Sequence, residues 1–199
     1  KYATSFGLNQ TTGIEIPESE PEISDEDSVR SAIGQGTNNY TTTQLARYIT
    51  AIANKGTVYN LTLLDKVTDV SGQVVEQQEP DILNNITDVS AGTWSTVQQG
   101  MRAVITSSRT YDVLGDFEMS GKTGTAQQSK THANHGLFVG FAPSSNPEIA
   151  FAIRIKNGYE SSYVGQIGRD LVRYYYGLAD YSALVTGKAS TLSGTVHSD

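Results

Sequence analysis

Apolar side chains recur at helical spacing in three parts of the chain. The first is the segment 41–56, TTTQLARYITAIANKG, where the apolar stripe consists of Leu45, Tyr48, Ile49 and Ile52. Thr41, followed three residues later by Gln44, matches an N-terminal capping box, and Gly56 is suited to end a helix. The pattern therefore predicts an amphipathic helix.

Two later segments repeat this spacing. The segment 93–107 has its apolar positions at Trp94, Val97, Met101, Val104 and Ile105. The terminal segment has them at Val164, Ile167, Leu171, Tyr174 and Tyr175, and a helix there is expected to end near Gly177. We interpret Trp94 and Met101 as core residues.

Between these helices the pattern predicts strands. The segment 57–78 is rich in β-branched residues and is interrupted by Ser71-Gly72, which is typical of a hairpin. Three strands are then expected at 117–127, 136–142 and 149–156. Three neighbouring strands between two helices predict an α+β fold, an antiparallel sheet with helices packed on it.

The rest of the chain sets the domain boundaries. With 199 residues the chain suits one domain with a core of its own, which we place at 1–180. The segment 181–199 is rich in Ser, Thr and Gly and is expected to be a disordered tail or a linker. The acidic segment 17–28 is interpreted as a solvated surface loop. Because the chain opens without a start signal, we expect a fragment of a longer protein.

Composition excludes several classes of function. The formal net charge is −7 and the sequence contains no Lys/Arg run, so a nucleic-acid interface is not expected. The absence of cysteine excludes a thiol nucleophile, thiolate metal ligands and disulfides. No apolar stretch approaches the ~20 residues that a membrane span needs.

The stretch MSGKTGTAQQ, residues 119–128, carries the candidate chemistry. A phosphate-binding P-loop would need a glycine at position 116, which is Asp116, and a helix after Thr123, where no apolar stripe follows. A metal site is also not predicted. His132 and His135 lie three residues apart without carboxylates at ligand spacing, and His197 is in the tail.

Acyl transfer fits the stretch better. In a strand, Thr123 and Thr125 share one face, and two hydroxyls side by side can hold a carboxylate with Lys122 adding positive charge. Gly124 leaves room for close approach to the backbone. A strand-edge N–H can stabilise an oxyanion, an interaction typically worth ~3 kcal/mol of barrier. K-T-G belongs, with S-x-x-K and S-D-N, to the signature of penicillin-recognising serine enzymes, although the tripeptide alone does not decide.

Longer segments extend the likeness. AIGQGTNNYTTTQLARYITAIANKGTVY, SGKTGTAQ and NHGLFVGFAP occur in the order and at the spacing of penicillin-binding protein transpeptidase domains, and FGLNQTTGIEIPE is similar to a further family segment. Together they cover most of residues 6–178. The chain most resembles the class B, monofunctional members, which are D,D-transpeptidases that cross-link peptidoglycan stem peptides and bind β-lactams.

This resemblance implies roles for the strand residues. Lys122 would hydrogen-bond in the network that serves the nucleophile, and the Thr125 backbone N–H would be one of two oxyanion donors. Thr123 and Thr125, with Gly124 between them, would bind the carboxylate of a D-Ala-D-Ala terminus or of a β-lactam. Gln127 is a candidate substrate contact and equally an ordinary solvent-facing residue.

The departures concern the nucleophile. The chain contains no S-x-x-K, and its one S-x-N, Ser144-Ser145-Asn146, lies downstream of Lys122 in a proline-flanked turn, so we interpret it as a coincidence. Thr42 stands where the family usually has proline, and Leu137 where it has tryptophan. We therefore expect the chain to be the C-terminal part of a transpeptidase domain, so that it contains only part of the transpeptidase fold. It would be inactive alone, within a parent that is a serine-type enzyme.

The resemblance also implies partners and location. It implies no metal or organic cofactor. The expected partners are the stem peptide, β-lactams and the missing N-terminal half of the domain, and the parent is expected to be bacterial, anchored to the cytoplasmic membrane and working outside it. The alternative is a non-catalytic module, either a sensor of β-lactam or peptidoglycan or a pseudo-enzyme.

Overall fold

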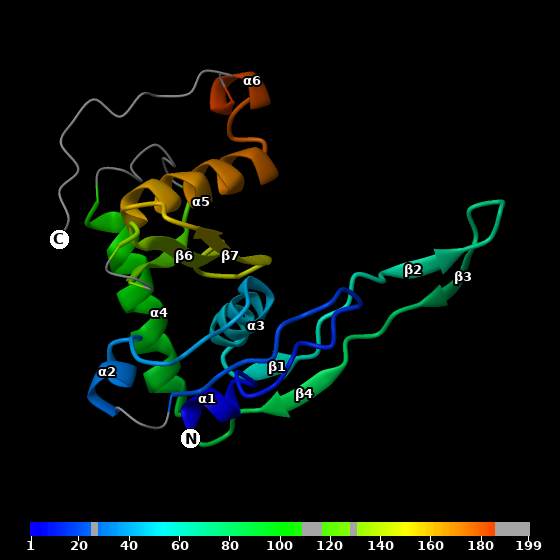
Figure 1. The fold of residues 1–199 in the computed structure, drawn as a ribbon. Helices are drawn as coiled ribbons and strands as arrows, with labels where there is room; N and C mark the ends of the chain where they lie inside the picture. The colour runs from blue at the N-terminus through cyan, green and yellow to red at the C-terminus, as the bar shows by residue number, and fades with distance from the viewer. Residues whose placement is uncertain (25–27, 109–116, 128–130, 186–199) are drawn as a thin grey trace.

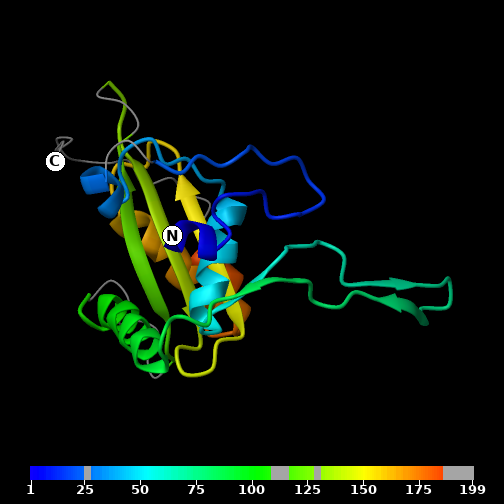
Figure 2. The same ribbon diagram turned by 90° about the horizontal axis from the view of Figure 1, so that it is seen from below.

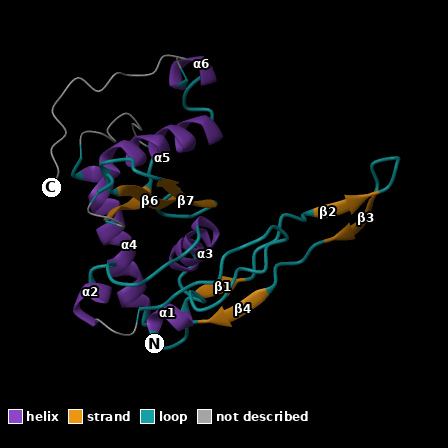
Figure 3. Cartoon of the chain, viewed as in Figure 1, coloured by secondary structure: helices purple, strands orange, loops and turns teal. Residues whose placement is uncertain are grey.

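The protein is described from a computed structural model, which covers residues 1–24, 28–108, 117–127 and 131–185. Its centre is a three-stranded antiparallel sheet in the order β5-β6-β7 (Figures 1 and 3). The strands are β5 (Ser120–Ala126), β6 (His135–Ala142) and β7 (Ile149–Ile155). The α+β class and all three strands agree with the prediction.

Helices cover both faces of this sheet. Helix α5 (Ser161–Tyr175) packs on one face, and α3 (Thr42–Ala53) packs on the other; α4 (Ala91–Thr106) runs beside β5 (Figures 1 and 2). Two apolar clusters result. The cluster under α3 contains Ile49, Ile52, Val58, Trp94, Met101 and Phe141. The cluster under α5 contains Ile105, Met119, Phe138, Phe151, Val164 and Val172. Trp94 and Met101 are core residues, as predicted.

Local sequence explains where these helices begin. Thr41 accepts a hydrogen bond from the Gln44 backbone N–H, and the Gln44 side chain accepts one from the Thr41 backbone N–H, so the predicted capping box is confirmed. Ser90 caps α4 through the N–H of Thr93.

Small residues bring α5 close to the sheet. A Cβ placed on Gly168 would lie 2.7 Å from the Phe138 ring, and one on Gly136 would lie 2.5 Å from Val164. The buried face of α5 is accordingly Val164, Gly165, Gly168 and Val172. The remaining apolar side chains of the predicted stripe point outward. Ile167 is 45% exposed and Tyr174 is 61% exposed.

The hairpin predicted around Ser71-Gly72 forms, but it takes up only part of the segment 57–78, and residues 57–59 pair with a strand beyond that segment. Strand β1 (Thr57–Tyr59) pairs with β4 (Ile82–Asn85), and β2 (Lys66–Thr68) pairs with β3 (Val74–Gln77) in an exposed arm that projects from the body (Figure 1). The turn of this arm is built on Asp69, whose carboxylate accepts from the N–H groups of Ser71 and Gln73.

Three short helices complete the description: α1 (Tyr2–Ser5), α2 (Ser28–Ala32) and α6 (Tyr181–Leu184). Helix α2 was not predicted. Helix α6 lies at the start of the predicted tail, and residues 186–199 lie outside the described part of the chain. Within that described part, no helix combines the length and apolar character needed to cross a membrane.

Candidate active site

Strand β5 has one unpaired edge. Its seven residues pair continuously with β6, from Ser120 opposite Phe141 to Ala126 opposite His135, and no other strand in the described ranges pairs with it. We call the side of β5 turned away from β6 the outer edge. Because the pairing has no bulge, alternate residues direct both their N–H and C=O groups to this edge.

The hydrogen bonds identify which residues these are. The carbonyl oxygens of Met119, Thr123 and Thr125 accept from side chains rather than from β6. Arg102 Nη1 donates to Met119 at 3.1 Å and Lys122 Nζ to Thr123 at 2.8 Å. Gln35 Nε2 donates to Thr125 at 3.4 Å. The Thr125 N–H therefore also faces the outer edge, while Lys122, Gly124 and Ala126 bond to β6.

The side chains of the site divide between the two faces of β5. Thr123 stands opposite Phe138 and Thr125 opposite Gly136, so both hydroxyls lie on the α5 face of the sheet. Lys122 and Gly124 lie on the α3 face. Thr125 and Lys122 are exposed and Thr123 is half-buried. The arrangement offers two neighbouring hydroxyls, an ammonium group and an outward N–H within four residues.

The remaining candidates lie near this strand or at its far end. Gln127 directly follows β5 and is exposed. Among the described residues, a Cβ built on Gly124 would meet only Leu137, at 3.5 Å, which is an ordinary contact distance. Ser144 bonds to Ser120 through their hydroxyls at 2.8 Å, which places the S-x-N triplet at the opposite end of β5 from Thr125.

The histidines are engaged locally. His135 is buried at the start of β6, and its Nδ1 accepts from the Asn157 N–H at 3.1 Å. Burial lowers the pKa of His135, and the charges of Arg154 and Lys156 lower it further. His132 contacts the Thr131 hydroxyl. In the residues that the structure describes, no three His, Cys, Asp or Glu side chains form a metal-binding group, and His197 lies outside them.

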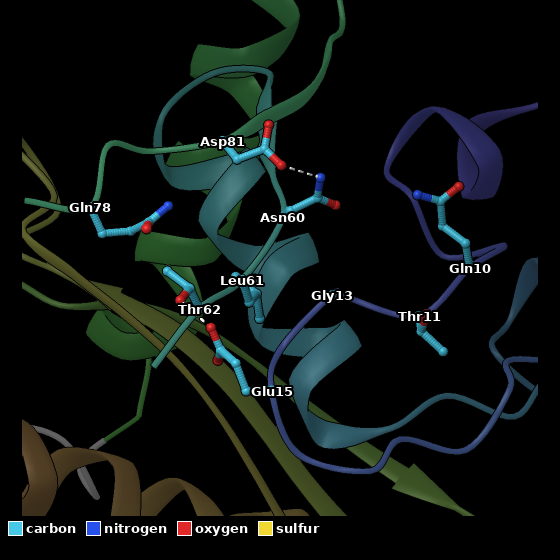
Figure 4. Close-up of a pocket in the computed structure, with 9 residues that line it drawn as sticks. All are labelled: Gln10, Thr11, Gly13, Glu15, Asn60, Leu61, Thr62, Gln78 and Asp81. Atoms are coloured by element: carbon cyan, nitrogen blue, oxygen red, sulfur yellow. Dashed lines mark hydrogen bonds between the residues drawn. The ribbon is translucent and has the colours of Figure 1, made fainter. Parts of the chain in front are cut away.

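A polar hollow of about 420 Å³ lies elsewhere, where the N-terminal segment meets the base of the arm (Figure 4). It is lined by Gln10, Thr11, Gly13, Glu15, Asn60, Leu61, Thr62, Gln78 and Asp81. Its carboxylates already have partners, since Asp81 accepts from Asn60 at 2.7 Å and Glu15 accepts from Thr62 and from the Leu63 N–H. We interpret the hollow as part of the packing between the arm and the N-terminal segment, not as a ligand site.

A second polar cluster surrounds Arg47 and Gln44, which are both fully buried. We call it the clasp. Arg47 on α3 has no exposed surface and donates to the carbonyls of Gly7, Gln10 and Thr11. Gln44 also donates to the carbonyl of Gln10. The clasp thereby ties the N-terminal segment to α3.

Glu18 is the anionic end of the clasp, although it falls in the segment predicted to be a solvated loop. Burial favours its neutral form, but the combined hydrogen bonds from Thr43, Thr12 and Thr41 outweigh this, so the pKa of Glu18 is lowered. The acidic composition of 17–28 indicated solvent exposure. Only the hydrogen bonds from Thr12, Thr41 and Thr43 reveal Glu18 as an acceptor.

Sequence analysis missed the two residues that flank the outer edge. Arg102 projects from α4 and Gln35 from the loop after α2, and both bond to β5 backbone far away in sequence. For Gln35 a signal existed, the polar side chain between two glycines in Gly34-Gln35-Gly36. For Arg102 no local signal distinguishes it from other helix-surface arginines.

Comparisons with known proteins show which family the chain is similar to. The family model for the penicillin binding protein transpeptidase domain matches residues 1–173. Penicillin-binding protein 2A of Bacillus subtilis is 30% identical over 203 residues, which covers 89% of this chain and 28% of that protein. The peptidoglycan D,D-transpeptidase MrdA of Acinetobacter baumannii is 28% identical, over 88% of this chain and 30% of that protein.

A solved structure shares the fold. Penicillin-binding protein 2B from Streptococcus pneumoniae strain R6 superimposes with a TM-score of 0.73 at 27% identity, covering 88% of this chain and 32% of that one. The chain thus spans less than a third of the length of these curated relatives.

Proposed function

The chain belongs to the transpeptidase domain family of penicillin-binding proteins, and from this premise we propose that it forms the substrate-binding wall of a serine D,D-transpeptidase. The observation that carries the proposal is the outer edge of β5, where the Thr125 N–H faces away from β6 next to two hydroxyls and an ammonium group. The relative named a peptidoglycan D,D-transpeptidase supports the reaction type.

The proposed reaction is acyl transfer from a D-Ala-D-Ala terminus. A serine oxygen attacks the carbonyl carbon of the terminal peptide bond, and the carbonyl oxygen becomes an oxyanion that the Thr125 N–H stabilises. Collapse of this intermediate expels the terminal D-Ala and leaves an acyl-enzyme. An amine of a neighbouring stem peptide then attacks the ester and releases the serine. A β-lactam would follow the first half of this course.

The strand residues would hold the donor peptide in place. The hydroxyls of Thr123 and Thr125 would donate to its terminal carboxylate, because both lie on one face of β5. Lys122, on the opposite face, would hydrogen-bond within the nucleophile's network. Its Nζ is already at the outer edge, bonded to the Thr123 carbonyl. Gly124 would give the ligand room, and Gln127 would be a more distant contact.

We propose that the nucleophile and its base come from a part of the domain outside the printed sequence. The 199 residues contain no S-x-x-K, and strand hydroxyls without a neighbouring base are weak nucleophiles. The outward stripe of α5 supports a covering segment. Tyr163, Ile167, Leu171 and Tyr174 are spaced on one side of the helix and are between 38% and 61% exposed.

In this proposal the parent is a bacterial envelope protein, anchored to the cytoplasmic membrane with this domain outside, where peptidoglycan is assembled. Residues 1–180 would be the C-terminal portion of its transpeptidase domain, and 181–199 a tail. A non-catalytic sensor or pseudo-enzyme remains the second candidate, favoured by the absence of S-x-x-K from the chain.

Incubation with a fluorescent penicillin tests the proposal. We expect covalent labelling of the full-length parent and none of the isolated chain. Covalent labelling of the isolated chain would contradict an external nucleophile. A parent that is labelled but releases no D-Ala from a stem-peptide donor would favour the sensor, and a parent that is not labelled would favour the pseudo-enzyme.

A further inference from the structure

The loop that carries Gln35 is sharply constrained. Gly34 and Gly36 on either side have φ angles of 76° and 93°, which other residues rarely adopt. The Gln35 N–H donates to the Arg30 carbonyl at 2.9 Å, so the loop folds back on α2. A Cβ on Gly36 would lie 2.9 Å from Ser24 Oγ, which leaves no room for a larger residue without a shift.

One side chain fixes this loop from beneath. Asn38 Nδ2 donates to the Gln35 carbonyl at 3.0 Å, while Asn38 Oδ1 accepts from the Ser24 N–H and the Tyr40 hydroxyl, each at 2.9 Å. Burial raises the pKa of Tyr40, so its phenol stays protonated and remains a donor. The backbone of Gln35 is therefore held from segments before and after it.

From this support the Gln35 side chain crosses to β5. Its amide nitrogen lies 3.4 Å from the Thr125 carbonyl oxygen, a contact between residues 90 positions apart. The distance is long for an N–H···O bond, and such contacts in unliganded sites often tighten when ligand binds. A carbonyl oxygen accepts two hydrogen bonds, so a ligand can also bond to Thr125.

We propose that Gln35 is a positioning residue of the transpeptidase site, whose amide holds the Thr125 backbone at the outer edge so that the Thr125 N–H is aimed at the developing oxyanion. This inference rests on the proposed function. Thr125 directs its N–H and C=O to the same edge, so a restraint on the carbonyl limits rotation of the residue as a whole.

The position of the N–H decides how much this restraint matters. Donors must lie within roughly 0.5 Å of the productive geometry, and a misplacement of about 1 Å can cost ~10²-fold in rate. Beyond Ala126 the chain leaves the sheet, and on the outer edge no strand among the described residues supports Thr125. Gln35 supplies that support from a loop that is itself fixed.

The test uses the full-length parent and its acylation by a penicillin, separated into the dissociation constant of the first complex and the rate constant of acylation. Gln35→Ala removes the amide, and we expect a roughly tenfold lower acylation rate with the dissociation constant nearly unchanged. Gln35→Glu places a carboxylate against a carbonyl oxygen. We therefore expect its acylation rate at pH 8 to be lower than that of Gln35→Ala.

The pH dependence of the acylation rate distinguishes this role from a purely structural one, which would leave that dependence unchanged. As the pH approaches a carboxyl's ordinary pKa of about 4.3, a growing fraction of the variant side chains carries an O–H and can donate to Thr125 again. The acylation rate of Gln35→Glu, taken relative to wild type at each pH, should therefore recover toward pH 4.5, and that of Gln35→Ala should not. Gln73→Glu, which adds the same charge on the exposed arm, is the matched control and should match wild type throughout.

Three results would overturn the inference: acylation rates equal to wild type in both variants, losses that follow a lowered melting temperature, or no acid recovery in Gln35→Glu. Failure of the proposed function is distinguishable from these, because the wild-type parent itself would then not be acylated.

Discussion

In both the clasp and the outer edge of β5, polar side chains lie next to backbone hydrogen-bonding groups. The two regions differ in whether these groups are paired within the chain or exposed. In the clasp, the guanidinium of Arg47 has no exposed surface and donates to three backbone carbonyls. Glu18 accepts hydrogen bonds from three threonines. At the outer edge, Lys122 and Thr125 are exposed, and the Thr125 N–H faces away from β6. The first arrangement is closed within the chain, and the second is open to a ligand.

The difference separates polarity that stabilises from polarity that binds. A buried polar group must be paired inside the molecule, since leaving it unpaired costs about 1–3 kcal/mol. A strand edge can leave its donors exposed because water satisfies them until a ligand replaces the water. Mutations in the two regions should therefore have different effects. Those in the clasp should lower the free energy of unfolding, and those at the edge should lower the acylation rate.

The largest expected effect is on the clasp. Arg47→Met keeps the length of the side chain but removes the donor from the carbonyls of Gly7, Gln10 and Thr11, of which that of Gly7 is buried. We expect a loss of about 3–5 kcal/mol in the free energy of unfolding, measured by urea denaturation of the parent's transpeptidase domain. Lys66→Met on the exposed strand β2 is the control and should stay within about 0.5 kcal/mol. Equal effects would mean that the clasp is not structural.

A pair of proline substitutions tests the edge. Thr125→Pro removes an N–H that faces outward, which an edge strand tolerates, whereas Ala126→Pro removes one that bonds to β6. We expect Thr125→Pro to lower the penicillin acylation rate about 10²–10³-fold with a small change in melting temperature. Ala126→Pro should destabilise the domain by about 1–3 kcal/mol, because it leaves a backbone carbonyl of β6 without its donor.

The pair of proline substitutions needs one further control, and one outcome would contradict the prediction. Thr125→Ala keeps the N–H but loses the hydroxyl, so it should acylate faster than Thr125→Pro. If Thr125→Pro unfolds the domain as much as Ala126→Pro, the N–H of Thr125 does not face the outer edge.

Sequence reasoning found what depends on local pattern. The capping box at Thr41, the three long helices, the three central strands and the family of the K-T-G segment all follow from spacing over a few residues. It did not find the pairing of β1 with β4, because the 22-residue segment 57–78 already contained a plausible hairpin.

Two residues show why the rest was hidden. Arg47 lies between apolar positions of α3 and looks like a surface arginine, and only the carbonyls of the N-terminal segment make its burial favourable. Ile167 repeats the apolar spacing of α5, yet the sheet is contacted by the glycine side of the helix. Both depend on contacts between segments far apart in sequence.

A smaller effect is expected from the anionic end of the clasp. The pKa of Glu18 is lowered by its hydrogen bonds, so its contribution to stability is present above the unfolded pKa near 4.5 and is lost as pH falls through the folded pKa. Glu18→Gln should cost about 1.5 kcal/mol at pH 7. The gap to wild type should narrow progressively in melts below pH 4.5, and a constant gap would show that ionisation of Glu18 is unimportant.

The smallest effect is expected at His135, which stands opposite Ala126 at the end of β5 and is buried. Its pKa is lowered by burial and by two cationic neighbours, so the unfolded chain binds the proton more readily than the folded one. Stability should therefore decline as pH falls below about 6.5 toward the folded pKa. His135→Gln should remove this slope and change the pH 5 to pH 7 difference in melting temperature by about 2 °C. An unchanged slope would assign the decline to other groups, and the pKa of His135 would then be the same in the folded and unfolded states.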